Sequence, residues 1–108
     1  MRKLYLFTDA SFDSAMEKAG LDKKDYSNEQ LAELREGAKN GVDLKVFSNP
    51  DLTDIQMRII RWGLEEGLDA AAYADPKLSY TQMHESYLEM ERKVSFLGEF
   101  DLMLANVV

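Results

Sequence analysis

The sequence predicts a mainly α-helical domain, an array or compact bundle of about four helices built on a tandem helix-and-loop repeat. Three observations predict this fold: an internal repeat, helix-start signals at the same point of each copy, and apolar residues spaced three and four apart. The chain, residues 1 to 108, is expected to form a single domain, because its length suits one hydrophobic core. The repeat core covers about residues 27 to 90.

The repeat is visible as an alignment without gaps of residues 30 to 50 on residues 56 to 76, at an offset of 26 positions. The identical pairs are Gln30/Gln56, Arg35/Arg61, Gly37/Gly63, Gly41/Gly67, Asp43/Asp69 and Pro50/Pro76. Leu31, Leu34 and Phe47 recur conservatively as Met57, Ile60 and Tyr73. Gln82 and Met83 begin a further copy, and Gly20-Leu21-Asp22 with Tyr26 is an earlier, partial one. Similarity at a fixed period is typical of repeat architectures, in which one supersecondary unit stacks on the next.

Helices are expected near residues 9 to 19, 28 to 40, 54 to 66 and 80 to 97. Thr8 or Asp9 can cap the first. Each of the other three begins with a capping box, in which a hydroxyl residue precedes a glutamine by three positions and the two satisfy free backbone donors. These boxes are Ser27 with Gln30, Thr53 with Gln56, and Ser79 with Gln82.

The loop after each repeat helix should be ordered. Gly41 and Gly67 stand where a left-handed residue ends a helix, so both are expected to have positive φ. Phe47 and Tyr73 are expected to anchor these loops in the core. Asp43 and Asp69 are expected to brace the loops from within, because each follows the helix-ending glycine by two positions.

The helix at 54 to 66 has two apolar faces, which predicts a central position between two neighbours. Ile55, Ile59 and Trp62 fall on one side of it, and Met57, Ile60 and Leu64 on the other. The positions that match the first face in the preceding helix are Glu29, Glu33 and Glu36. This acidic stripe is either the solvated side of an end helix or an acidic docking surface.

Both ends of the chain leave more than one structure open. Residues 2 to 7 suit a short strand. Residues 100 to 108 could pair with it, although Phe100, Met103, Leu104 and Val107 also fit a helical period. We expect a short two-stranded element.

Composition excludes several classes of function. The net charge of -7, from 20 acidic and 13 basic residues, disfavours direct binding to nucleic acid and favours a partner with a basic surface. No cysteine is present, which excludes disulfides and thiolate sites and suits the reducing cytoplasm. No apolar run is long enough for a signal peptide core or a membrane helix, so no membrane partner is expected.

The strings QLAELREGAKNGVDLKVFSNP and QMRIIRWGLEEGLDAAAYADP carry a further indication. They resemble the short repeat of accessory proteins from conjugative transposons and related mobile elements of gut Firmicutes. The resemblance implies a bacterial mobile-element context and the contest between such elements and host defences. An anti-CRISPR-type inhibitor of a host nuclease is the function that this context favours, with the cytoplasm of a bacterial host as its location. The alternative is an adaptor module that tethers other conjugative-element proteins and inhibits nothing.

No residue pattern predicts catalysis, a metal site or a cofactor. His84 is the only histidine and has no second histidine or cysteine to complete a ligand set, so we interpret it as a surface residue. Paired carboxylates could serve an enzyme, but here they are expected on solvent-facing helix positions. Trp62 would be a binding residue only if it were exposed, since a tryptophan at such a position is more often part of the core. The residues expected to bind a basic partner are Glu29, Glu33, Glu36, Asp51, Asp54, Glu65, Glu66 and Asp69. The resemblance implies that this partner is a CRISPR-associated nuclease or its guide-RNA complex.

Overall fold

The computed structural model describes the backbone of residues 6–105 and the side chains of residues 6–95. Within that range the helices are α1 (Asp9–Ala19), α2 (Asn28–Lys39), α3 (Asp54–Glu65) and α4 (Tyr80–Ala105). Short 3-10 turns follow the first three: η1 (Lys23–Asp25), η2 (Leu44–Val46) and η3 (Ala70–Tyr73). The mainly helical fold is therefore confirmed, as are the predicted starts of all four helices.

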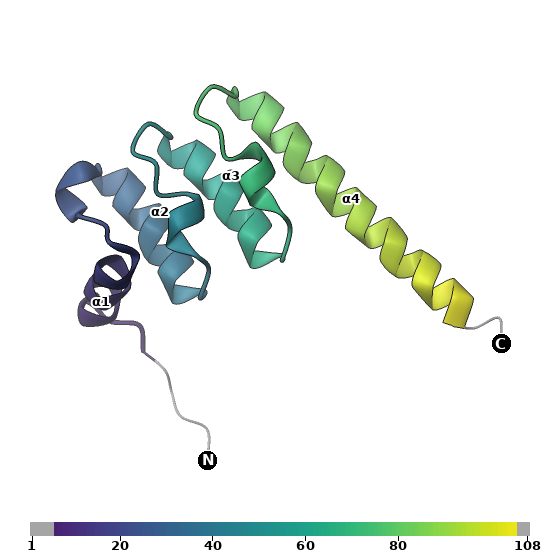
Figure 1. Ribbon diagram of the computed structural model, residues 1–108, viewed down its shortest axis with the longest axis horizontal. Coiled ribbons are helices and arrows are strands. Elements are labelled where there is room, and N and C mark those ends of the chain that lie inside the picture. Colours follow the sequence, from purple (N-terminus) through teal and green to yellow (C-terminus); the bar gives the residue numbers. More distant parts are fainter. Residues whose placement is uncertain (1–5, 106–108) are drawn as a thin grey trace, which may run out of the picture.

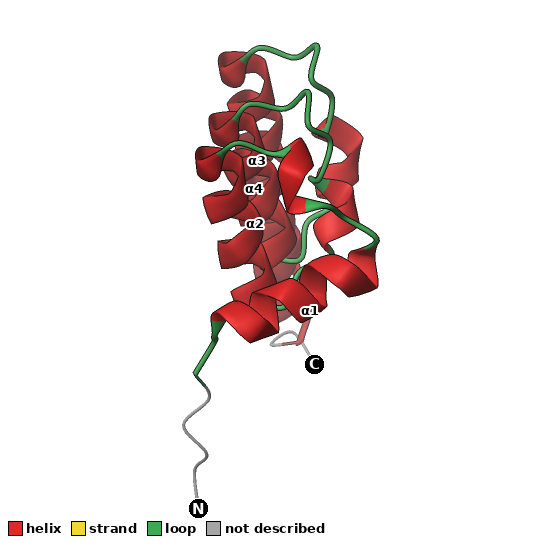
Figure 2. Cartoon of the chain, turned by 90° about the vertical axis from the view of Figure 1, so that its left-hand side faces the viewer, coloured by secondary structure: helices red, strands yellow, loops and turns green. Residues whose placement is uncertain are grey.

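The repeat unit is one helix followed by a segment that returns along it. Figure 1 shows α2, α3 and α4 side by side, each beginning at the same edge of the array. Figure 2 shows that these helices form one layer and that the returning segments, with their 3-10 turns, form a second. The predicted central place of α3 is confirmed, because it contacts both α2 and α4.

Capping boxes begin α2, α3 and α4 as predicted, and in α2 and α3 the glutamine also bonds to a second segment. In α3, Gln56 accepts a hydrogen bond from the Thr53 backbone N–H at 2.8 Å, while its own N–H lies 3.1 Å from the Thr53 hydroxyl. The Gln56 side-chain amide also donates to the carbonyls of Pro76 and Leu78, at 3.3 and 2.7 Å. Gln30 makes the equivalent bonds to Pro50 and Leu52. The glutamine thus ties the start of a helix to the end of its returning segment.

The returning segment lies so close to its own helix that only glycine fits at the crossing. A Cβ on Gly37 would lie 2.5 Å from Cζ of Phe47, and one on Gly63 would overlap the Tyr73 hydroxyl. Phe47 and Tyr73 are 0% and 1% exposed, so their predicted burial in equivalent positions is confirmed. Burial also raises the pKa of Tyr73 to about 12.

The loops after α2 and α3 have the predicted glycine conformation, but only one of the two predicted aspartate braces. Gly41 and Gly67 both have φ of 77°, the left-handed conformation expected at these helix ends. Asp43 braces its loop by accepting from the Lys45 N–H at 3.0 Å. The same role predicted for Asp69 is wrong, because its side chain makes no cap hydrogen bond to η3.

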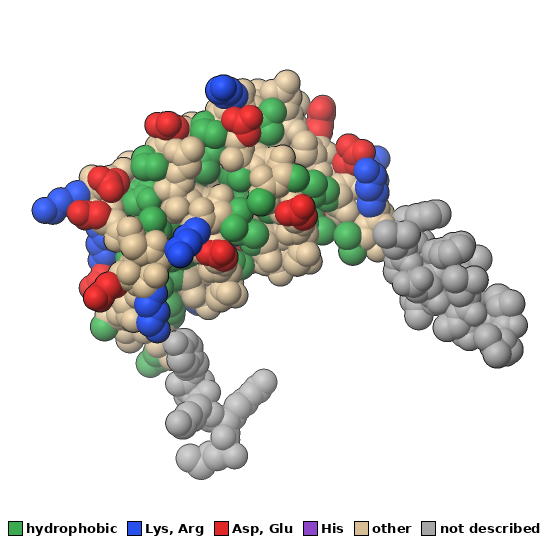
Figure 3. All heavy atoms as spheres, in the orientation of Figure 1, with side chains coloured by type: hydrophobic (Ala, Val, Ile, Leu, Met, Phe, Trp, Pro, Cys, Tyr) green, Lys and Arg blue, Asp and Glu red, His purple; other side chains and the backbone are tan. Residues whose placement is uncertain are grey.

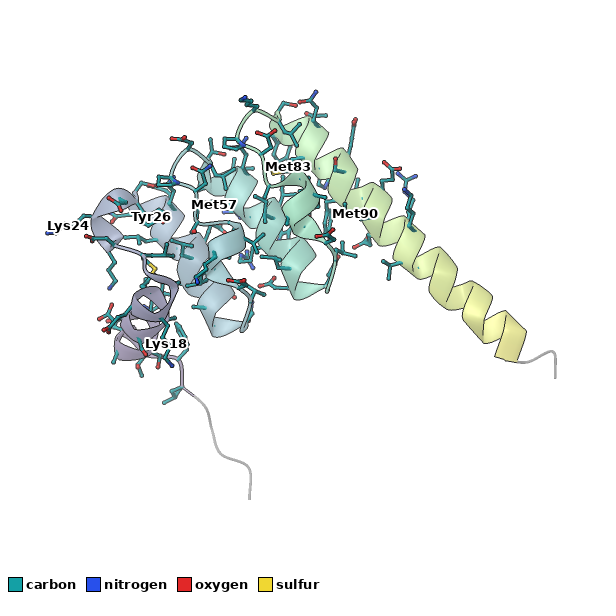
Figure 4. All side chains as sticks on the ribbon, in the orientation of Figure 1. Lys18, Lys24, Tyr26, Met57, Met83 and Met90 are labelled. Carbon is teal, nitrogen blue, oxygen red and sulfur yellow. The ribbon has the colours of Figure 1, made fainter. Side chains whose placement is uncertain are left out.

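The core lies between the two layers and is built from equivalent positions of successive units. Met57 on α3 and Met83 on α4 hold the same repeat position and are both fully buried (Figure 4). Leu34, Ile60 and Leu52 belong to the same core and are 0 to 1% exposed.

The first helix is attached at the other end of the array. Arg35 binds Asp9 at 2.6 Å and lies over the rings of Phe7 and Phe12, which attaches α1 to α2.

The prediction of a two-stranded element is wrong for residues 6, 7 and 100 to 105, the part of it that the structure describes. Residues 100 to 105 belong to α4, which continues past the predicted end at residue 97. Of the two patterns in this segment, the helical period of Phe100, Met103 and Leu104 predicted the structure and the strand pattern did not. The single Gly98 does not end the helix, because it weakens a helix by only about 1 kcal/mol. Residues 1–5 and 106–108 lie outside the described residues, and Leu6 and Phe7 are not in a strand. Among the residues described, no helix combines the length and apolar character needed to cross a membrane.

The contact between Gly63 and Tyr73 yields a stability test. We expect Gly63→Ala to lower the free energy of unfolding by about 1–3 kcal/mol, because the added methyl group overpacks the core. Tyr73→Phe in the same background should recover part of the loss, since the hydroxyl is the nearest obstacle. Urea denaturation of both single variants and the double variant measures this coupling. Additive effects of the two substitutions would contradict the proposed overlap.

Candidate partner-binding surface

The repeat determines which side chains meet between neighbouring helices. Residues 33 of α2 and 59 of α3 are equivalent, and each faces the next helix along the array. Glu33 contacts Arg58 and Arg61 on α3, and the repeat equivalents of these two residues on α4 are His84 and Tyr87. One repeat position therefore builds two interfaces, the α2/α3 seam and the α3/α4 seam, and the sequence fills them with different chemistry.

Charge dominates the α2/α3 seam. Glu33 is 6% exposed and binds Nε of Arg58 at 2.8 Å and Nε of Arg61 at 3.0 Å. Arg61 also donates to both oxygens of Glu65, at 3.0 and 2.9 Å, and Asn40 donates to the same carboxylate. Burial alone would lower the pKa of Arg61, but the hydrogen bonds to Glu65 and Glu33 outweigh it and raise the pKa. The guanidinium of Arg61 therefore stays charged inside the seam.

The interpretation of Glu29, Glu33 and Glu36 as one solvated or docking stripe is wrong for its central member. Glu29 and Glu36 are exposed, whereas Glu33 is buried against the two arginines. The reason is that α2 is not an end helix: α1 covers its other side, and the stripe faces α3. Glu33 and Glu65 are consequently neutralised within the protein.

Aromatic side chains dominate the α3/α4 seam. Ile59 is 1% exposed at its centre, whereas Ile55 and Trp62, nearer its two ends, are 44% and 37% exposed. The expected neighbour on this side of α3 is present and covers Ile59, whereas Trp62, interpreted from the sequence as a core residue, is partly exposed. The Trp62 ring lies 6.1 Å from that of Tyr87, at an angle of 49°. His84 is half-buried and stacks between Tyr80 and Tyr87, at 5.9 and 6.1 Å.

Two carboxylates converge on the Tyr87 hydroxyl beside Trp62. Its oxygen lies 2.8 Å from Glu66 and 3.0 Å from Glu91. A tyrosine hydroxyl has one proton, so it donates to only one carboxylate at a time. Desolvation by neighbouring side chains raises the pKa of Glu66, although the residue as a whole is exposed, and Glu91 and Glu65 raise it further, whereas the bond from Tyr87 lowers it. Burial and the carboxylates of Glu66 and Glu91 raise the pKa of Tyr87, whose hydroxyl therefore stays protonated.

The end of α3 and the N-terminal third of α4 border a shallow depression at this point. It is lined by Trp62, Glu65, Glu66 and Tyr87, and we call it the Trp62 depression. Glu65 and Glu66 were predicted site residues, and Trp62 was a candidate only if exposed, as it is. Tyr87 and Glu91 were missed, although Glu91 is the repeat equivalent of Glu65 and could have been found by that offset.

The other predicted site residues do not gather with these. Asp51 and Asp54 lie before and at the start of α3, Glu29 lies at the start of α2, and Asp69 follows the end of α3. Glu29, Glu36, Asp51 and Asp69 are exposed, and Asp54 is half-buried. On the face that carries the returning segments, acidic and basic side chains are interspersed (Figure 3). The eight residues thus do not form one continuous acidic surface.

Within the described part of the chain, no group of three or more potential ligands is placed to hold a metal ion. Comparison with protein-family models, with curated proteins and with solved structures gives no match. The likeness of the repeat to mobile-element proteins therefore stays a prediction.

The buried ion pair of the α2/α3 seam predicts unequal roles for two neighbouring glutamates. We expect Glu33→Gln to lower the free energy of unfolding by about 2–3 kcal/mol, because it leaves Arg61 buried with only Glu65 as a partner. Glu36→Gln, the exposed control, should change it by less than about 0.5 kcal/mol. Urea denaturation compares them. Equal effects would show that Glu33 is solvated after all.

The raised pKa of Glu66 predicts a pH-dependent stability. A carboxyl with a folded-state pKa above its ordinary value of 4.5 contributes most to stability when protonated, and loses this contribution as pH rises through the folded value. Glu66→Gln cannot ionise, so near neutral pH it should melt at a higher temperature than the parent. The difference in melting temperature between Glu66→Gln and the parent should decrease as pH falls toward 4.5. Circular dichroism melts at several pH values measure it, with Glu85→Gln as control; a constant gap would refute the cause.

Proposed function

We propose that this protein is a non-enzymatic binding module that docks on a protein partner with a basic surface. The observation that carries the proposal is Trp62, which is 37% exposed in a depression that also bears carboxylates. Tryptophan contributes more to protein interfaces than almost any other residue, because it buries a large rigid surface and has an indole N–H donor. The equivalent positions in the flanking helices hold Glu36 and Leu88, so the aromatic group is specific to this seam.

Long-range electrostatics supports a basic partner. The net charge is -7 at pH 7. Of the eight predicted residues, Glu29, Glu36, Asp51 and Asp69 are exposed and have no ion pair among the described residues. Such charges increase the rate of association with a positive surface and repel nucleic acid, so direct nucleic-acid binding is not part of the proposal.

Inhibition of a host defence nuclease is the form of this function that we favour. The likeness of the repeat to mobile-element proteins supplies the context. A basic groove that binds guide RNA or target DNA supplies a complementary surface in the bacterial cytoplasm. The protein would occupy that groove and exclude the nucleic acid.

The alternative, an adaptor that tethers conjugative-element proteins, is favoured by the array itself. Stacked repeats present extended surfaces that many partners can use. An adaptor would bind such proteins without changing the activity of any nuclease.

The test uses the whole chain against a CRISPR nuclease loaded with its guide RNA. We expect the parent to inhibit target cleavage, and complex formation to weaken as salt rises from about 0.1 to 0.5 M because screening shortens the reach of surface charges. A variant with Glu29→Gln, Glu36→Gln, Asp51→Asn and Asp69→Asn should associate more slowly and lose most of this salt dependence. Absence of inhibition across the nucleases of several hosts, with co-purification of conjugation proteins, would establish the adaptor instead.

A further inference from the structure

We propose that the Trp62 depression binds the side chain of an arginine presented by the protein partner. This inference rests on the proposed function and specifies the chemistry by which the partner is recognised. It is carried by three features that meet at one place: an exposed indole, an excess of carboxylate charge, and an internal example of the same recognition.

The exposed indole provides a stacking surface. Trp62 is held from one side by Tyr87, whose ring is 6.1 Å away and 8% exposed, while 37% of Trp62 remains open to solvent. A planar guanidinium stacks on such a ring and is attracted by its negative face. The ring is fixed by the seam, so little conformational entropy would be lost when a ligand covers it.

The carboxylates beside the indole lack enough positive partners. Glu65 is already ion-paired with Arg61, which lies in the α2/α3 seam. Glu66 and Glu91 instead share the single hydroxyl proton of Tyr87, at 2.8 and 3.0 Å. A guanidinium has five donors in one plane and can hydrogen-bond to carboxylates at its edge while its face lies on the indole. An ammonium group is a point charge without this shape, so arginine should be preferred to lysine.

The protein already uses this recognition between α1 and α2. Arg35 binds the Asp9 carboxylate at 2.6 Å while its guanidinium lies 5.6 Å from the centre of the Phe7 ring and 5.8 Å from that of Phe12. Tyr87 holds the repeat position of Arg35 two units later. In the α3/α4 seam the chain thus supplies aromatic rings and carboxylates but no arginine, and the partner would supply it.

Trp62 is the only tryptophan in the chain, so its fluorescence reports on the depression directly. The probe is the acetylated, amidated peptide Gly-Arg-Gly-Arg-Gly, compared with versions in which lysine or citrulline replaces arginine. We expect a saturable change of emission with the arginine peptide, binding at least about fivefold weaker with lysine, and none with the uncharged citrulline. Equal affinity for the arginine and citrulline peptides would overturn the proposal.

Matched variants separate a local site from general attraction to an acidic protein. Glu66→Gln and Glu85→Gln remove the same charge, but Glu85 is exposed on α4 and is absent from the lining of the depression. We expect Glu66→Gln to weaken arginine-peptide binding about fivefold or more and Glu85→Gln by less than about twofold. Trp62→Leu, followed by calorimetry, should also lose affinity, and circular dichroism confirms that each variant is folded. Equal losses in the two glutamate variants would reduce the effect to net charge and overturn the inference.

The two proposals fail in different ways. If the arginine peptide binds as expected but no basic protein partner is inhibited or captured, the proposed function fails and the chemistry of the depression stands. If a nuclease is inhibited equally by the parent, Glu66→Gln and Trp62→Leu, inhibition is established by direct measurement, but docking through the Trp62 depression and the arginine site are both refuted.

Discussion

The close approach of each returning segment to its own helix is the constraint on which the rest of the array depends. Phe47 and Tyr73 reach the helix backbone only because Gly37 and Gly63 have no side chain there. The aromatic ring then fills the space between the two layers, and the glutamine of the capping box binds the end of the segment. The units of α2 and α3 are therefore closed by their own contacts, and the next helix begins at a fixed place beside each of them.

Part of this unit was predicted from the sequence because its signals are local, whereas the close crossings at Gly37 and Gly63 were not predicted. Capping boxes, left-handed glycines and buried loop aromatics are encoded within about 26 residues, and their signals are strong in each copy. The helix bounds were accordingly predicted well for α1, α2 and α3. The end of α4 was not, since no cap or proline marks it and the tail satisfies both strand and helix patterns.

The candidate site was predicted only in part, because it depends on which helix faces which. A single sequence marks Glu29, Glu33 and Glu36 as one stripe, but does not show that α3 lies against them with Arg58 and Arg61. Trp62 was noticed as unusual, but its exposed fraction depends on how α4 packs against α3, which places Tyr87 beside the indole. The same repeat position thus gives an ion-paired seam on one side of α3 and an aromatic seam, open at its end, on the other.

The chemical difference between the two seams restricts how this array could have grown. If the unit that holds α3 were copied in tandem, the new interface would place Ile59 against Arg58 and Arg61, and two arginines would lose the carboxylate that Glu33 gives them. A copy is therefore tolerated only after one face of it has changed to suit its neighbour. Neighbouring units can therefore stack only when their facing side chains differ in a complementary way. These side chains determine the order of the helices in the array.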